Sequence, residues 1–112
     1  MIMLIITIKG GGFMSSVSSD IVEYLKDYHT EERLAIKGRE LCTLFNLTDK
    51  QLRNVVSGLR QSGEAVCSSS YGYWYSTDPE DIEKTLRRLE GQVKNMNISI
   101  AGLQKVLTGG KE

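Results

Sequence analysis

Residues 48–61 combine an apolar helical stripe with a row of side chains that could hydrogen-bond to nucleic acid. Leu52, Val55, Val56 and Leu59 follow the i, i+3, i+4, i+7 spacing of one helix face. The opposite face carries ammonium, amide, guanidinium and hydroxyl groups, at Lys50, Gln51, Arg53, Asn54, Ser57, Arg60 and Gln61. Guanidinium and amide groups match the edges of bases, and cationic groups attract phosphates. The segment therefore predicts an amphipathic helix whose exposed face has the chemistry to contact a polynucleotide.

The ends of this helix are marked by residues with known capping roles. Thr48 suits the N-cap, and Gln51, three residues later, completes a capping box. Gly63 is expected to end the helix. A shorter helix is predicted just before it, over residues 39–45, with Asn46 at its end. Two helices joined by a tight turn, the second with an exposed polar face, form the helix-turn-helix pattern.

Shorter patterns precede these two helices. Apolar residues at helical spacing predict a first helix over residues 20–28, with a cap among residues 18–20. The apolar run Leu34–Ile36 indicates a small strand, which Gly38 breaks. We therefore expect three helices with one short extended segment between the first and the second.

A hairpin is predicted directly after the polar-faced helix. Ala65–Cys67 and Tyr73–Tyr75 have strand-forming composition, and Ser68–Gly72 is a turn region between them. Successive side chains of a strand point to opposite faces, so the three aromatic residues at 73–75 cannot all be buried. We expect Trp74 or its neighbours to pack on the core.

The two helices and the hairpin together resemble a known family. The segments "GRELCTLFNLTDKQLRNVVSGLRQSG" and "SSSYGYWY" resemble winged helix-turn-helix DNA-binding domains, in particular the small ones of phages and mobile elements of Gram-positive bacteria. The resemblance covers residues 20–78. It implies that the helix at 48–61 enters the major groove of DNA and that the hairpin forms a wing.

The resemblance also implies which residues face DNA. They lie on the helix and on the wing: Thr48, Lys50, Gln51, Arg53, Asn54, Ser57, Arg60, Ser68, Ser69, Ser70 and Tyr71. Arg53 could reach guanine, and Gln51 or Asn54 could reach adenine, because these side chains match the base edges. Lys50 and Arg60 are expected on phosphate, and the wing residues on the DNA backbone or in the minor groove.

A long helix is predicted over residues 78–108. Asp78 suits its cap, Pro79 its first turn and Gly109 its end. Apolar residues alternate spacings of four and three along it, at Ile82, Leu86, Leu89, Val93, Met96, Ile100, Leu103 and Leu107. This heptad seam favours dimerisation by coiled-coil pairing, and packing on the chain's own domain or on another protein remains open.

The first residues have a different character. Residues 1–8 are strongly apolar but shorter than the roughly 20 residues that span a bilayer. The codons AAAGGAGGT, a strong bacterial ribosome-binding sequence, encode Lys-Gly-Gly, which occurs at residues 9–11 shortly before Met14. We therefore expect translation to begin at Met14 and residues 1–13 to be a misassigned leader or disordered. The alternative is a short hydrophobic strand that joins the core, and glycines 10–12 form a flexible hinge in either case.

Composition argues against several classes of protein. The chain has 14 basic and 14 acidic residues, so a nonspecific, strongly basic nucleic-acid coating protein is disfavoured. With a single histidine, His29, no catalytic constellation can be assembled, and "KGGGF" lacks the context of a phosphate-binding loop. Cys42 and Cys67 are expected to be free, buried thiols, as in a reducing cytoplasm. No enzyme activity, catalytic residue, cofactor or metal site is predicted.

These expectations combine into one interpretation with one alternative. We expect a mainly α fold with a small β-hairpin: a winged domain at 14–77, the long helix at 78–108 and a tail at 109–112. The expected protein is a cytoplasmic homodimer without membrane contact that binds double-stranded DNA and regulates transcription in a phage or mobile element. The alternative is a protein-interaction or replication accessory factor that acts through its long helix.

Overall fold

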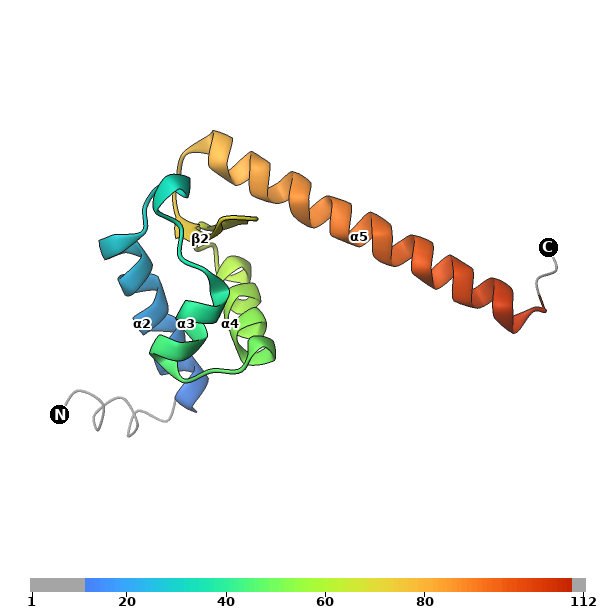
Figure 1. Cartoon of the computed structure of the whole chain (residues 1–112), viewed down its shortest axis with the longest axis horizontal. Coiled ribbons are helices and arrows are strands. Elements are labelled where there is room, and N and C mark those ends of the chain that lie inside the picture. Colours follow the sequence, from blue (N-terminus) through green and yellow to red (C-terminus); the bar gives the residue numbers. More distant parts are fainter. Residues whose placement is uncertain (1–11, 110–112) are drawn as a thin grey trace.

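The computed structural model describes residues 12–109, with side chains from Ser16 onward. The fold is mainly helical with one two-stranded antiparallel hairpin and a long final helix, as the sequence predicts (Figure 1). The elements in chain order are α2 (Gly12–Tyr28), η1 (Glu32–Leu34), α3 (Gly38–Phe45), α4 (Asp49–Gln61), β1 (Val66–Ser69), β2 (Gly72–Tyr75) and α5 (Pro79–Leu107). Residues 1–11, most of the expected leader, lie outside the described residues.

Helix α2 begins earlier than the sequence analysis predicts. The predicted start near residue 20 and the predicted hinge at Gly12 are both wrong, because the helix already includes Gly12. Val17 is buried and extends the apolar stripe of Ile21 and Leu25 by one turn toward the N-terminus. Packing of this extra turn outweighs the weak helix propensity of the serines around it.

The pair α3 and α4 follows the predicted helix-turn-helix pattern. Asn46 ends α3 in the left-handed region, with φ 57°. The Thr48 hydroxyl accepts from the Gln51 backbone N–H at 3.1 Å, and the Gln51 side chain accepts from the Thr48 N–H at 2.9 Å. Gly63 follows the end of α4 with φ 93°. The predicted capping box and the predicted end of α4 are therefore confirmed.

The hairpin is longer and its turn tighter than predicted. The strands pair from Val66 opposite Tyr75 to Ser69 opposite Gly72, so the turn consists of residues 70–71 alone. The predicted strand at 34–36 is wrong except at Ile36, because Leu34 belongs to η1 and only Ile36 pairs with a strand. It exchanges two backbone hydrogen bonds with Tyr73, at 2.8 and 2.9 Å.

The core lies between α2, α3, α4 and the hairpin. Its residues are mostly leucine, isoleucine and valine, and the apolar stripe of α4 is fully part of it. Tyr73 and Tyr75 pack against this cluster, as predicted for Trp74 or its neighbours, and Trp74 lies outside the cluster but is 0% exposed rather than exposed as the alternate position. Tyr73 and Tyr75, on the opposite face of β2, are half-buried.

Helix α5 leaves the domain and extends beyond it (Figure 1). Its N-cap Asp78 accepts from the Glu80 N–H at 2.9 Å, and Gly109 follows its end with φ 73°, as predicted. The radius of gyration is 17.5 Å, compared with about 13 Å for a compact domain of 100 residues. Every residue from Glu90 to Gly109 is exposed. The second half of α5 therefore has no support from the rest of the described chain.

Candidate nucleic-acid interface

The polar face of α4 points to solvent. Lys50, Gln51, Arg53, Asn54 and Ser57 are exposed, whereas the apolar stripe of the same helix is buried. The burial of that stripe fixes the rotation of α4, so these five side chains are presented together. A guanidinium, an ammonium, two amides and a hydroxyl thus lie on one accessible helix surface.

The capping box limits what two of the predicted residues can do. The Thr48 hydroxyl and the Gln51 side-chain oxygen both accept hydrogen bonds from the first turn of α4. A bidentate contact with adenine needs both the oxygen and the nitrogen of an amide side chain. Asn54 therefore suits base recognition better than Gln51, and Thr48 is primarily a capping residue.

Arg60, which is predicted to contact phosphate, forms hydrogen bonds within the chain. Its Nε donates to the Val66 carbonyl at 2.8 Å and its Nη2 donates to the Ser68 hydroxyl at 3.0 Å. The side chain is half-buried, and burial lowers the pKa of its guanidinium. Arg60 is thus first of all the link that holds the hairpin against the end of α4. These bonds could not be predicted from residue spacing, because the acceptor atoms lie in another element, and the phosphate contact of Arg60 stays a prediction.

The predicted wing-tip residues divide into two groups. Ser68 and Ser69 belong to β1, and Ser68 is held on both sides, by Arg60 and by a bond from its N–H to the Thr85 hydroxyl at 3.2 Å. Ser70 and Tyr71 form the turn and are exposed. The prediction that Ser68 and Ser69 lie at the wing tip is wrong. Only the turn residues Ser70 and Tyr71 lie exposed at the tip, as predicted.

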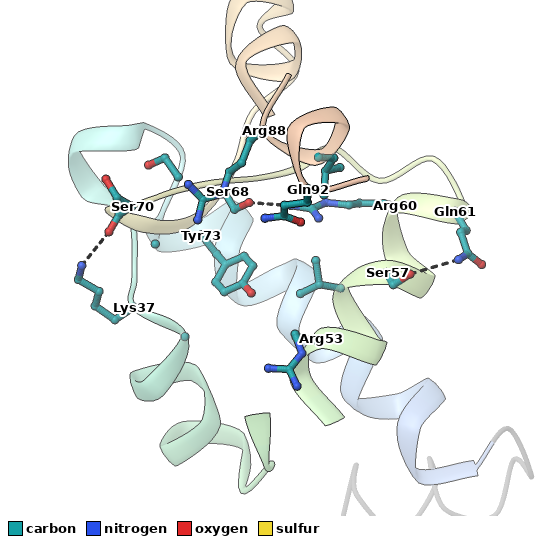
Figure 2. Close-up of a pocket in the computed structure, with 15 residues that line it drawn as sticks. Lys37, Arg53, Ser57, Arg60, Gln61, Ser68, Ser70, Tyr73, Arg88 and Gln92 are labelled. Atoms are coloured by element: carbon teal, nitrogen blue, oxygen red, sulfur yellow. Dashed lines mark hydrogen bonds between the residues drawn. The ribbon is translucent and has the colours of Figure 1, made fainter. Parts of the chain in front are cut away.

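A groove lies between α4, the hairpin and the first half of α5. It has a volume of about 730 Å³. Arg53, Ser57 and Gln61 line it from α4, and Arg88 and Gln92 from α5. Figure 2 shows the α5 side chains near Ser68 and Arg60, with the Ser57–Gln61 hydrogen bond at one end of the groove. Gln51, Asn54 and Lys50 do not line it, so the accessible surface of α4 has two adjoining parts.

The groove is basic. Lys37, Arg53, Arg60 and Arg88 line it, and no aspartate or glutamate does. Lys37 sits at one end, where its ammonium donates to the Ser70 carbonyl at 3.0 Å (Figure 2). In the part of the chain that the structure describes, no ion pair involves Lys37, Arg53 or Arg88. The neutral whole chain therefore contains a local concentration of positive charge.

Several residues of this groove were not predicted to face DNA, among them Lys37, Arg88 and Gln92. Arg88 and Gln92 are four residues apart on α5, and this spacing places them on the same helix face. That spacing was the available signal. It became informative only once the start of α5 was placed beside the hairpin.

The predicted heptad seam of α5 is divided by its environment. Ile82 and Leu89, near the domain, are partly buried, and Leu89 lines the groove. Farther along, Met96, Ile100 and Leu103 are 58%, 52% and 68% exposed. The intrachain packing that the sequence left open thus applies to the start of the seam. The exposed remainder is available for a partner.

Other chemistry-bearing residues have structural surroundings. The His29 Nδ1 donates to the Leu34 carbonyl at 2.6 Å, and its Nε2 is buried without a hydrogen-bond partner among the described residues. Cys67 is buried as expected, whereas Cys42 is only half-buried. Within residues 12–109 there is no group of His, Cys, Asp or Glu side chains that could hold a metal ion. None of the described helices is long and apolar enough to cross a membrane.

Comparison with models of protein families, with curated proteins and with solved structures gives no match for this chain.

Proposed function

We propose that this chain binds double-stranded DNA sequence-specifically through α4 and the hairpin, and that it regulates transcription in the cytoplasm of a phage-infected or element-carrying bacterium. The observation that carries the proposal is the exposed polar face of α4 beside a groove that contains only basic charge. A helix with base-matching side chains next to a cationic groove supplies base readout and phosphate attraction on one surface.

In this proposal α4 enters the major groove, which is wide enough to admit a helix. Arg53 and Asn54 are adjacent and exposed, and their side chains match guanine and adenine respectively. The exposed Lys50 would contact the phosphate backbone. The exposed turn residues Ser70 and Tyr71 would contact the backbone or the minor groove as a wing.

We further propose that two copies pair through the exposed part of α5. Most helical stability in proteins comes from packing of an apolar face, and this part of α5 leaves valine, methionine, isoleucine and leucine side chains exposed. The only charged residues in the segment 91–109 are Lys94 and Lys105, and neither lies on the seam. Two copies could therefore bring their seams together without repulsion between like charges at the flanks.

A symmetric dimer would place two copies of α4 on one face of the duplex. The expected DNA site is then roughly palindromic, with half-sites about 34 Å apart or a multiple of that distance. This geometry connects the α5 seam with DNA recognition. The seam supplies the symmetry, and α4 supplies the contacts.

The direct test is the double variant Arg53→Ala, Asn54→Ala. Each base contact contributes roughly 1–3 kcal/mol, so specific affinity should fall at least about tenfold. The control is Lys94→Ala, Asn95→Ala, which removes the same pair of residue classes from exposed positions of α5. Unchanged affinity in the α4 variant, with both proteins folded, would reject α4 as the recognition helix.

The alternative function is a protein-interaction or replication accessory factor that acts through α5. The exposed apolar side chains at residues 93–107 favour it. It predicts no specific DNA binding by the wild type and a protein bound along the seam. Loss of that protein's binding on substitution in the seam, with DNA absent, would distinguish it from the proposed function.

A further inference from the structure

The first turns of α5 are fixed to the domain by contacts with three different elements. The Asp81 carboxylate accepts from the Trp74 indole at 3.2 Å, and the buried Thr85 hydroxyl accepts from the Ser68 N–H. The Lys84 ammonium pairs with Glu32 of η1 at 2.6 Å. These contacts occupy one face of α5 over its first two turns. The position of the next turn relative to the hairpin is therefore determined.

Arg88 and Gln92 lie just beyond these contacts and reach the groove. Both are exposed, and both come from α5, opposite Arg53 and Ser57 of α4 (Figure 2). The neighbouring Arg87 does not line the groove, and it pairs instead with Glu83 of its own helix at 3.9 Å. Two adjacent arginines of one helix thus have different surroundings.

The groove places positive groups close to each other without a counter-charge. Arg60 and Arg88 both line it, and the charge of Arg88 acts on the Arg60 guanidinium in the same direction as burial, lowering its pKa. Among the described residues, no carboxylate lines the groove. Guanidinium groups bind phosphate oxygens in a bidentate manner, and the serine hydroxyls nearby are further donors to such oxygens. An anion with several oxygen acceptors would satisfy this arrangement.

We propose that the groove between α4, the hairpin and α5 holds a phosphodiester segment of the bound DNA, with Arg88 and Gln92 as contacts from α5. The proposal rests on the proposed DNA binding and extends it to a third element. The helix that pairs two copies then also touches the duplex. Each copy of α5 contacts the DNA backbone beside the α4 of its own chain.

The groove is lined by residues at the start of α3, in α4, in both strands and in α5. The sugar-phosphate backbone of a DNA strand that passes along the exposed Arg53 would continue past the hairpin toward Arg88. The base contacts of α4 and the phosphate contacts of α5 would then follow one path.

The test is the salt dependence of duplex binding by the full chain and by Arg88→Gln, with Arg87→Gln as the matched control. Each phosphate contact contributes about 0.9 to the slope of log affinity against log salt. Arg88→Gln should reduce that slope by about 0.9, and Arg87→Gln should leave it unchanged. Arg88→Lys keeps the charge and should keep the slope. Circular dichroism melting verifies that each variant is folded.

The outcomes separate this proposal from the proposed function. Equal slopes for the wild type and both glutamine variants would overturn the groove contact while DNA binding itself stands. Equal losses in both variants would also overturn it, because they would show a general effect of charge. If the wild type binds no duplex at low salt, the proposed function fails and the groove contact fails with it.

Discussion

The indole nitrogen of Trp74 donates a hydrogen bond to the Asp81 carboxylate at 3.2 Å, which joins the hairpin to the first turn of α5. Trp74 is the only tryptophan of the chain and is 0% exposed. A buried N–H needs a partner, and here the partner comes from the helix that leaves the domain. The orientation of α5 is thus connected to the packing of the hairpin.

Removal of the Asp81 carboxylate should loosen this connection. Asp81→Ala leaves the buried indole N–H unpaired, which costs about 1–3 kcal/mol of the free energy of unfolding. Urea denaturation followed by Trp74 fluorescence measures the change. Glu80→Ala is the control, because Glu80 is an exposed acid at the neighbouring position. Equal stabilities of the two variants would show that the hydrogen bond contributes nothing.

A second prediction concerns Gly72, which has φ 130° at the start of β2. A Cβ at this position would collide with the carbonyl oxygen of Ile36, the residue that pairs with Tyr73. Gly72→Ala should therefore destabilise the domain by more than the roughly 1–3 kcal/mol of an unfavourable backbone conformation.

The matched control is Gly58→Ala, measured by thermal unfolding beside Gly72→Ala. Gly58 lies in α4, and an added Cβ there has nothing within 4 Å. Alanine at this site should stabilise the domain by up to about 1 kcal/mol through helix propensity. A neutral or stabilising Gly72→Ala would contradict the close approach of the hairpin to Ile36.

A third prediction uses the ion pair between Glu32 and Lys84. The hydrogen bond from Lys84 lowers the pKa of the Glu32 carboxyl, and a bond with Ser69 acts in the same direction. A carboxyl with a lowered folded-state pKa stabilises the fold above its unfolded pKa of about 4.3. That contribution is lost as the pH falls through the folded value, and it is small because both side chains meet solvent.

NMR titration of the Glu32 carboxyl checks this directly. In Lys84→Met the pKa of Glu32 should rise toward its ordinary value, and the acid limb of the stability curve should flatten. Lys94→Met is the control, since Lys94 is exposed on the distant half of α5. An unchanged Glu32 pKa in Lys84→Met would mean that the pair does not persist in solution.

A fourth prediction distinguishes the two faces of the exposed part of α5. Ile100 lies on the heptad seam and is 52% exposed, whereas Ile98 is off the seam and 61% exposed. Ile100→Asp should abolish self-association in sedimentation equilibrium, because it places a charge in the paired seam. Ile98→Asp should leave it intact. A monomeric wild type, or equal effects of the two variants, would contradict pairing through the seam.

Much of the fold follows from local rules in the sequence. The Thr48–Gln51 capping box, Gly63 after α4 and the Asp78–Pro79 start of α5 each act within a few residues, so the sequence alone predicts these ends. The start of α2 was missed because it depends on tertiary packing of Val17 against the core. The helix propensity of the serine-rich segment is weak, so the sequence alone did not indicate this start of α2.

The candidate interface was predictable only in part. The exposed side chains of α4 follow from helical periodicity. The hydrogen bonds of Arg60 were not predicted, because their acceptors, Val66 and Ser68, lie in the next element. Lys37 and Arg88 are far apart in the chain and line the same groove only because of how the hairpin and α5 are placed. Such groupings depend on topology, which residue spacing alone does not encode.

The measurement that tests the central claim most directly is binding of the full chain to duplex fragments from its own genomic neighbourhood. The titration is made across a salt series with competitor DNA present. The account predicts tight, salt-sensitive binding to one fragment that contains a roughly palindromic site, and its loss in the Arg53→Ala, Asn54→Ala variant. Binding to no fragment above the competitor at low salt would contradict DNA recognition by α4.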